Sequence, residues 1–139
     1  MKDDELLALA DAARKKAYSP YSGYTVGAAL LAEDGSVTTG CNVENASYGG
    51  TICAERTAVV RAVAEGKRSF RAIAIVGGRQ GKDAETLFMP CGICRQFLRE
   101  FCGDGFRIIV RGGGQTVVRT LAELLPGGFT TDAMRGPES

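Results

Sequence analysis

The sequence predicts an α/β fold in which a five-stranded mixed sheet lies between helices on both of its faces. Amphipathic helical segments alternate with short strand-like stretches, an order typical of a sheet covered by helices. Residues 71–76 contain the apolar run Ala-Ile-Ala-Ile-Val, which suits a central strand buried on both sides. The chain has 139 residues without a linker or internal repeat, so we expect a single domain over 1–139, with a loose tail at 130–139.

An amphipathic helix is predicted near the N-terminus, over residues 3–17. Asp3 or Asp4 can cap its start, and Ser19-Pro20 ends it because the residue before a proline avoids the α region. Its apolar residues recur at three- and four-residue spacing and form one packing face: Leu6, Leu9, Ala10, Ala13 and Ala17.

Two hairpins provide four of the five expected strands. Asp34-Gly35 is a two-residue hairpin signal, and Gly112-Gly113-Gly114 makes a second tight turn. The strand after this second turn must return along its predecessor, which makes the last strand antiparallel. The expected hairpins join residues 24–31 to 36–42 and residues 106–111 to 115–119.

Three further helices complete the pattern. Residues 53–65 carry an apolar stripe at helical spacing, and residues 92–101 form a second helix after a proline. The polar, glycine-bearing stretch 77–89 before that helix is expected to be a long loop. Thr120 and Glu123 fit a capping box for a short last helix.

The composition excludes several classes of protein. The formal net charge is +1 and neither sign forms a long block, which argues against a nucleic-acid partner. We find no signal peptide and no run of about 20 apolar residues, so we expect a cytoplasmic protein without a membrane partner. Histidine is absent, which excludes a Ser-His-Asp triad, a Cys-His pair and any histidine-ligated metal.

Three of the five cysteines fall at predicted helix starts. Cys53 opens one helix, and Pro90-Cys91-Gly92-Ile93-Cys94 opens another. Helix N-termini carry a partial positive charge that favours thiolates, so these three thiolates can converge on one metal. Three protein ligands with one open position are the pattern of a catalytic zinc. Glu55, in the first helical turn, can reach a water at that position without binding the metal.

The cysteine pattern also has other interpretations. Cys-x-x-Cys on its own is equally a redox pair or half of a structural zinc site. A fourth cysteine would close the site and make it structural. Cys102 is a poor candidate, because it lies about 12 Å along the helix from Cys94 at 1.5 Å per residue. Cys41 stays open as a fourth ligand, so the residues favour catalytic zinc over structural zinc and redox chemistry without deciding between them.

Asn42 and Glu44 are a candidate pair for one polar ligand. They are two residues apart, and in extended backbone such side chains point to the same side. An ordinary polar strand end would have the same appearance, and the two interpretations are equally good from the residues alone.

The cysteine pattern and its surroundings resemble the cytidine deaminases, in their small homotetrameric form with three cysteine ligands for zinc. Cys53-Ala54-Glu55 followed by the Pro-Cys-x-x-Cys segment at 90–94 is similar to the signature of zinc deaminases. The resemblance continues, in the family's order, from about residue 18 to 129. The further blocks are residues 18–22, 26–30, 40–46, 54–58, 94–96 and 123–127.

This resemblance implies a three-layer α/β/α cytidine-deaminase-like fold and a reaction. The reaction is zinc-dependent hydrolytic deamination of cytidine and deoxycytidine to uridine and deoxyuridine, a step of pyrimidine salvage. It implies one Zn²⁺ per subunit, held by Cys53, Cys91 and Cys94. Glu55 would take a proton from the zinc-activated water that attacks C4, pass it to N3, and later protonate the leaving amine.

The resemblance also implies how the nucleoside is held. Asn42 and Glu44 would hydrogen-bond the ribose, and the backbone of Ala54 would contact the base. The aromatic residues that would flank the nucleoside are Tyr24, Tyr48 and Phe129. The family is typically a homotetramer with shared sites, so Tyr48 and Phe129 are expected to serve another subunit's pocket. Tyr24 stands where the family usually has phenylalanine, and its hydroxyl needs a partner.

Arg56 is expected to tune the charge of the metal site. Three thiolates and Zn²⁺ sum to −1, which weakens the metal as an acid for its water. Helix N-termini draw part of this charge off the sulfurs. Arg56 could do the same by donating a hydrogen bond to a cysteine sulfur, as its family counterpart is thought to do. A surface ion pair is the plainer interpretation of this residue.

Three rival functions follow from the same residues. A blasticidin-type deaminase shares the zinc residues and the chemistry, although the Asn42-Val43-Glu44-Asn45 stretch favours the nucleoside enzyme. A non-catalytic structural zinc module would need a fourth protein ligand. A thiol redox protein would cycle Cys91 and Cys94 without metal. Polynucleotide editing is disfavoured by the absence of basic patches and of the His-x-Glu form of the signature.

Overall fold

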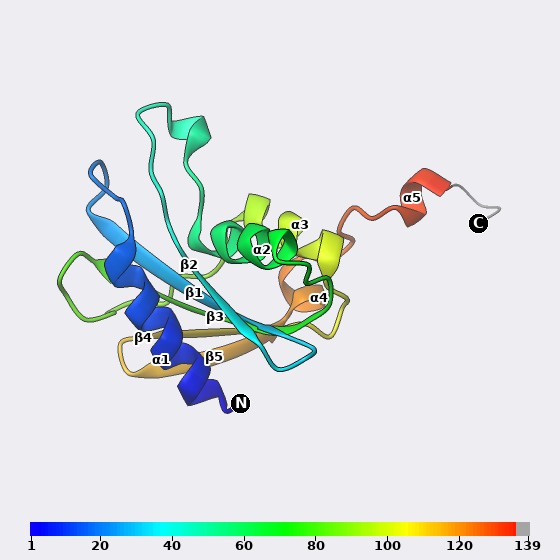
Figure 1. Ribbon diagram of the computed structural model, residues 1–139, viewed down its shortest axis with the longest axis horizontal. Helices are drawn as coiled ribbons and strands as arrows, with labels where there is room; N and C mark the ends of the chain where they lie inside the picture. The colour runs from blue at the N-terminus through cyan, green and yellow to red at the C-terminus, as the bar shows by residue number, and fades with distance from the viewer. Residues whose placement is uncertain (136–139) are drawn as a thin grey trace.

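A computed structural model describes residues 1–135, which form one five-stranded sheet with helices on both faces (Figure 1). The strands are β1 (Tyr24–Ala32), β2 (Val37–Cys41), β3 (Phe70–Arg79), β4 (Arg107–Gly112) and β5 (Gln115–Thr120). The helices are α1 (Asp3–Ala13), α2 (Ala54–Ala64), α3 (Gly92–Phe101), α4 (Leu121–Leu124) and α5 (Asp132–Arg135), with short 3₁₀ turns η1 (Arg14–Lys16) and η2 (Tyr48–Gly50).

The sheet is mixed, with strand order β2-β1-β3-β4-β5. β1 is antiparallel to both β2 and β3, β3 is parallel to β4, and β4 is antiparallel to β5. β3 and β4 can be parallel because the connection between them contains α3, which returns the chain to the end of the sheet where β3 began. The predicted five-stranded mixed sheet with an antiparallel last strand is confirmed.

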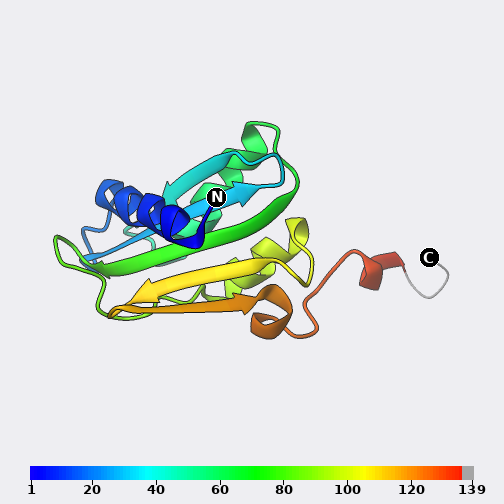
Figure 2. The same ribbon diagram turned by 90° about the horizontal axis from the view of Figure 1, so that it is seen from below.

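The two faces of the sheet hold separate hydrophobic clusters. Ala28 and Leu30 of β1 face α2 and α3, whereas Ala29 and Leu31 face α1, as the alternation of side chains along a strand requires. Figure 2, seen from below, shows α1 in front of the sheet and α2 and α3 behind it. The three-layer α/β/α arrangement predicted from the sequence is therefore confirmed.

The first helix is shorter than predicted, and one edge of its buried face differs from the prediction. It ends at Ala13 and continues as η1, so the predicted helix over 3–17 was too long. Leu9 was wrongly assigned to the packing face, because its side chain is 38% exposed. Leu7 is buried instead, since it lies three residues before Ala10 on the face that meets the sheet.

The central strand β3 is longer than predicted. Residues 77–79 were expected to begin a loop, but they extend the strand to Arg79. The extension is stabilised by pairing with the start of β1, where Tyr24 is opposite Arg79 and Val26 is opposite Gly77. The connection that follows, residues 80–91, leads directly to α3.

Helix α2 packs on β2 at Gly40. A Cβ atom at this position would lie 2.4 Å from the backbone nitrogen of Ala58 and 2.6 Å from the carbonyl oxygen of Ala54. Only glycine permits this approach, which sets the position of the N-terminus of α2 relative to the sheet.

Two segments project from the sheet and its helices (Figure 1). One is the loop that carries η2, and the other leads from α4 to α5. The loose tail expected at 130–139 is described only in part: residues 132–135 form α5, and residues 136–139 lie outside the described part of the chain. Within residues 1–135, no helix has the length and apolar character needed to cross a membrane.

Candidate metal centre and substrate site

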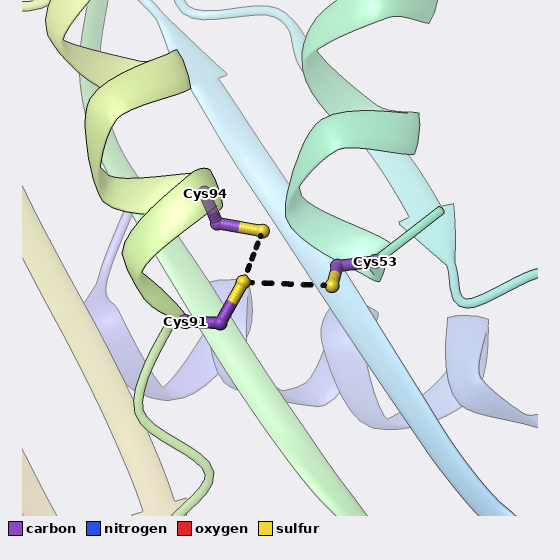
Figure 3. Close-up of side chains that lie close together, drawn as sticks. All are labelled: Cys53, Cys91 and Cys94. Atoms are coloured by element: carbon purple, nitrogen blue, oxygen red, sulfur yellow. Dashed lines mark hydrogen bonds between the residues drawn. The ribbon is translucent and has the colours of Figure 1, made fainter. Parts of the chain in front are cut away.

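Cys53, Cys91 and Cys94 form one cluster between the N-termini of α2 and α3 (Figure 3). The Sγ atoms of Cys53 and Cys91 are 3.8 Å apart, and those of Cys91 and Cys94 are 3.4 Å apart. All three sulfur atoms lie within 4.8 Å of one another. Three sulfurs at this separation can contact one metal ion at the Zn–S distance of about 2.3 Å. The structure therefore brings together the three predicted ligands.

The local sequence places each cysteine at a helix start. Cys53 is the N-cap of α2 and Cys91 the N-cap of α3, both with extended backbone, and Cys94 lies in the first turn of α3. Neither N-cap side chain hydrogen-bonds the helix, so both sulfurs are free to turn toward the cluster. The partial positive charges of two helix N-termini are thereby directed at the same three sulfurs, which favours their thiolate forms.

The proton distribution in the cluster also suits a metal. The pKa of the Cys53 thiol is lowered to about 5, because hydrogen bonds from Cys94, Arg56 and Cys91 to its sulfur outweigh the effect of burial. The pKa of Cys94 is raised, chiefly because its thiol donates to Cys53 and then because it is buried. Without metal, Cys53 is therefore a thiolate that accepts a hydrogen bond from the Cys94 thiol. Binding of a thiophilic metal such as zinc would release the remaining thiol protons.

No fourth protein ligand joins the cluster within residues 1–135. Neither Cys41 nor Cys102 belongs to the group of sulfurs that lie close together. Cys102 is buried at the end of α3, and burial raises the pKa of its thiol to about 12. A closed site with four protein ligands, as the structural zinc interpretation requires, is therefore not built from the described residues.

Glu55 lies beside the cluster but does not belong to it. It is the second residue of α2, and only 4% of its surface is exposed. Burial, and then the charge of Cys53, raise the pKa of its carboxyl to about 7, against hydrogen bonds from its own backbone amide and from Cys94. A carboxyl group with a pKa near neutrality can both accept and return a proton, which is the property required of a general acid–base.

Arg56 also contacts the cysteine cluster. Its Nη2 donates to the carbonyl oxygen of Thr51 at 3.1 Å and to the Sγ of Cys53 at 3.8 Å. Its buried Nε has no hydrogen-bond partner among the described residues. The guanidinium therefore faces a thiolate rather than a surface carboxylate, and the ion-pair interpretation finds no partner within residues 1–135.

Asn42 and Glu44 both face the first residues of β1 and the turn before it. Asn42 is buried; its Oδ1 accepts from the amide of Val26 at 2.8 Å, and its Nδ2 donates to the carbonyl oxygen of Tyr24 at 2.9 Å. Glu44 accepts hydrogen bonds from the turn at Tyr21 and Ser22. The two side chains are thus directed at the same segment of chain, as residues on one side of an extended backbone would be.

Tyr24 lies beside two residues that sequence reasoning missed. Its ring centroid is 5.9 Å from that of Phe88, and the guanidinium carbon of Arg79 lies 5.8 Å from the Tyr24 ring. Phe88 also covers Gly77 of β3, where a Cβ atom would lie 2.6 Å from its ring. An aromatic residue three positions before Cys91 was the available signal for Phe88; Arg79 had none, because residues 77–79 were expected to be loop.

The remaining predicted substrate residues are differently placed. Ala54 is fully buried at the first position of α2, beside Cys53. Tyr48 is 78% exposed on η2 and touches only the edge of the Tyr21 ring among the ring contacts of residues 1–135. Phe129 is 60% exposed, and its backbone N–H and C=O are both held by the Gln96 side chain. The structure therefore buries neither aromatic side chain within one chain.

Residues 1–110 match the cytidine and deoxycytidylate deaminase zinc-binding region. The chain belongs to this family. A cytidine deaminase from Sporosarcina psychrophila is 46% identical over 133 residues, which cover 95% of this chain and 94% of that protein. The matched zinc-binding region, residues 1–110 of this chain, includes the three clustered cysteines, so the metal of this chain is zinc.

Two further comparisons place the chain within that deaminase family. The crystal structure of a cytidine deaminase from Burkholderia pseudomallei superposes with a TM-score of 0.85 at 46% identity, covering 93% of this chain and 100% of that one. A Blasticidin-S deaminase from Bacillus cereus is 29% identical over 108 residues, 76% of each chain. The similarity to a cytidine deaminase is therefore both higher and more extensive.

Proposed function

We propose that this protein is a zinc-dependent cytidine deaminase that converts cytidine and deoxycytidine to uridine and deoxyuridine. The observation that carries the proposal is the buried Glu55 carboxyl beside three clustered cysteines. A structural zinc site would have no use for a buried acid of raised pKa next to the metal. A dithiol redox site would not need a third converging thiol. Hydrolysis at a zinc centre needs both features.

The reaction replaces the amino group at C4 of the pyrimidine by oxygen, consuming one water and releasing one ammonia. Cys53, Cys91 and Cys94 would hold zinc, which supplies the Lewis acidity that makes water a nucleophile near neutral pH. Glu55 takes the proton that this water loses and delivers it to N3. It later gives a proton to the leaving amine. The raised pKa of Glu55 supports this use, because one carboxyl must alternate between its two protonation states.

The nucleoside would be held by the backbone beside Glu55 and by groups around the start of β1. The backbone of Ala54, between Cys53 and Glu55, would contact the base. Asn42 and Glu44 would hydrogen-bond the ribose. An amide oxygen and an amide NH₂ can each make two hydrogen bonds, so Asn42 keeps one acceptor site and one donor hydrogen for a ligand beyond its bonds to β1. Tyr24, together with Phe88, would flank the nucleoside with aromatic surface.

Tyr48 and Phe129 would complete the pocket of another subunit in a homotetramer. The support for this is that both side chains are exposed and lie on the two segments that project from the sheet and its helices (Figure 1). Aromatic residues are enriched at protein–protein interfaces relative to the rest of the protein surface. We further propose a role in pyrimidine salvage in the cytoplasm, which follows from free nucleosides as substrates.

Turnover of cytidine and of blasticidin S by the zinc-loaded protein would decide between the two deaminase activities. We expect loss of the cytidine absorbance with release of one ammonia per uridine formed, and a kcat/KM for blasticidin S lower by about a hundredfold or more, since each unmatched buried polar contact costs affinity. Turnover of blasticidin S alone would assign the second activity. Turnover of neither by zinc-replete folded protein would contradict the proposal.

A further inference from the structure

The carboxylate of Glu44 is held by the turn at Tyr21 and Ser22. Its Oε1 accepts from the backbone amide of Tyr21 at 3.1 Å and from that of Ser22 at 3.0 Å. Its Oε2 accepts from the hydroxyl of Ser22 at 2.5 Å. The turn is made possible by Gly23, which has a φ of 74°. These three hydrogen bonds hold the Glu44 carboxylate in one orientation before any ligand binds, although Glu44 and Ser22 are 22 residues apart in the chain.

A count of acceptor sites shows where a ligand could bind this carboxylate. An ionised carboxylate offers about four lone-pair sites, two on each oxygen. The two amides occupy both sites of Oε1, and the hydroxyl of Ser22 occupies one site of Oε2. The remaining site is on Oε2. A hydroxyl group of a sugar would therefore donate to the same oxygen that Ser22 holds.

The hydroxyl of Ser22 also connects Glu44 to Tyr24. It has one hydrogen, which it donates to Glu44, and it accepts from the backbone amide of Tyr24 at 3.0 Å. The carbonyl oxygen of Tyr24 is in turn bonded by the amide group of Asn42. The carbonyl group of Tyr24 is thus bonded directly to Asn42, whereas its N–H group is bonded to Ser22, which in turn donates to Glu44.

From this geometry we infer that Ser22 is a positioning residue for the sugar of the nucleoside. It orients Oε2 of Glu44 toward a sugar hydroxyl and connects that oxygen to the backbone of Tyr24, whose ring would flank the nucleoside. The inference rests on the proposed function. It adds a residue that does not itself touch the substrate, and it assigns the sugar contact to one oxygen of Glu44.

The charge state of Glu44 is consistent with this role. The hydrogen bond from the Ser22 hydroxyl has the largest effect and lowers the pKa of the Glu44 carboxyl; burial opposes it, and the bonds from the two backbone amides lower the pKa further. The group is therefore ionised at neutral pH and acts only as an acceptor. A sugar hydroxyl, which can donate, is the complementary partner, whereas a phosphate would be repelled.

Steady-state kinetics of zinc-loaded full-length Ser22→Ala, Ser22→Thr and wild type would test the inference, with 2′,3′-dideoxycytidine as a competitor that lacks both ribose hydroxyls. We expect Ser22→Ala to raise KM for cytidine by roughly three- to tenfold, as the loss of one hydrogen bond to a charged group predicts, with kcat within about twofold. The inhibition constant of dideoxycytidine should be unchanged, and Ser22→Thr, which keeps the hydroxyl, should restore KM.

Ser36→Ala is the matched control. Ser36 also donates its hydroxyl to a carboxylate in an exposed turn, that of Asp34 at 2.6 Å, but lies in the β1–β2 hairpin. This variant should have the wild-type KM, which separates a local effect of Ser22 from the general cost of removing a serine from a turn.

The outcomes separate the inference from the function on which it rests. An unchanged KM in Ser22→Ala, an equal loss of affinity for cytidine and dideoxycytidine, or a Ser22→Thr variant as weak as Ser22→Ala would each overturn the positioning role while wild-type turnover stands. Absence of cytidine turnover by zinc-loaded wild type would overturn the proposed function, and the inference with it.

Discussion

Arg56 is the residue that we propose to tune the charge of the metal site. Three thiolates and one Zn²⁺ carry a net charge of −1, which reduces the Lewis acidity of the metal. The guanidinium of Arg56 donates to the sulfur of Cys53, and this contact draws electron density from one ligand. Removing a group that hydrogen-bonds a metal ligand typically costs roughly 10- to 100-fold in metal affinity or activity.

Replacing Arg56 by alanine should therefore lower turnover while most of the zinc is retained. We expect a loss in kcat of roughly 10- to 100-fold, the range typical of groups that support metal ligands. Metal content by atomic absorption and cytidine turnover, measured on the same sample, would check this. Arg61→Ala, at the opposite end of α2 where Arg61 donates to Thr39, is the control and should keep its activity. Equal turnover of Arg56→Ala and wild type at matched zinc content would refute the role.

At the scale of elements, the position of α2 on the sheet determines the position of Cys53. Gly40 of β2 contacts the backbone of α2 at Ala54 and Ala58 so closely that a Cβ atom could not be accommodated without a shift of the helix. The nearest atoms belong to the backbone, which cannot move aside as a flexible side chain can. A shift of α2 would move Cys53 and Glu55 away from the two cysteines of α3.

Gly40→Ala is predicted to destabilise the fold and weaken zinc binding together. Inserting one methyl group into such a contact should cost about 3 kcal/mol of unfolding free energy, and the displaced Cys53 should lower zinc affinity. Urea unfolding and zinc release to a chromogenic chelator would measure the two effects. Gly103→Ala is the matched control, because a Cβ atom there meets nothing within 4 Å and its φ is not positive. Wild-type stability and zinc affinity in Gly40→Ala would contradict this account of the packing.

The elements that the sequence predicted well are those with a local signal. Cys53 and the Cys91–Cys94 pair could be placed at helix starts because apolar periodicity and a proline mark where these helices begin. Cys53 and Cys91, which are 38 residues apart in the chain, then meet because the N-termini of α2 and α3 converge. The extension of β3 to Arg79 had no such signal, since its glycine-containing end is held by pairing with β1. Leu9 was assigned wrongly because it and Leu7 lie at opposite edges of the stripe formed by Leu6, Ala10 and Ala13, and helical spacing alone does not decide which edge is buried.

Contacts within the site were harder to predict than the metal ligands. Asn42 and Glu44 could be named as a candidate pair, but the hydrogen bonds of Glu44 to the turn at Tyr21 and Ser22 join residues about 20 positions apart and leave no trace in local sequence. The tilted ring contact between Phe88 and Tyr24 depends on how the connection after β3 folds back over the sheet. Such contacts are products of tertiary structure, which composition and periodicity do not encode.

At the scale of the whole molecule, two exposed aromatic side chains support the proposed sharing of sites between subunits. Tyr48 and Phe129 are largely exposed, and both lie on segments that project from the sheet and its helices. In the proposed homotetramer of four 14.6 kDa chains, each would enter a neighbouring site. The metal ligands and Glu55 of a site would then come from one subunit and part of its aromatic lining from others.

Shared sites predict complementation between two defective variants. Glu55→Gln should lack the acid–base group, and Tyr48→Ala should lack a side chain that serves a neighbour. Co-expressed as hybrid tetramers, the two should recover turnover, because a Tyr48→Ala subunit with an intact Glu55 can receive Tyr48 from its Glu55→Gln partner. Activity of the co-expressed protein no higher than that of the separate variants combined would argue against shared sites, as would a mass of one chain in solution.

The most direct test of the central claim compares wild type with Glu55→Gln at equal zinc content. Ultraviolet-monitored turnover of cytidine is the measurement. If zinc at Cys53, Cys91 and Cys94 and proton transfer by the buried Glu55 perform the reaction, wild type should deaminate cytidine and the variant should be slower by roughly 10²- to 10⁴-fold. A Glu55→Gln protein that turns over cytidine at the wild-type rate would contradict the account.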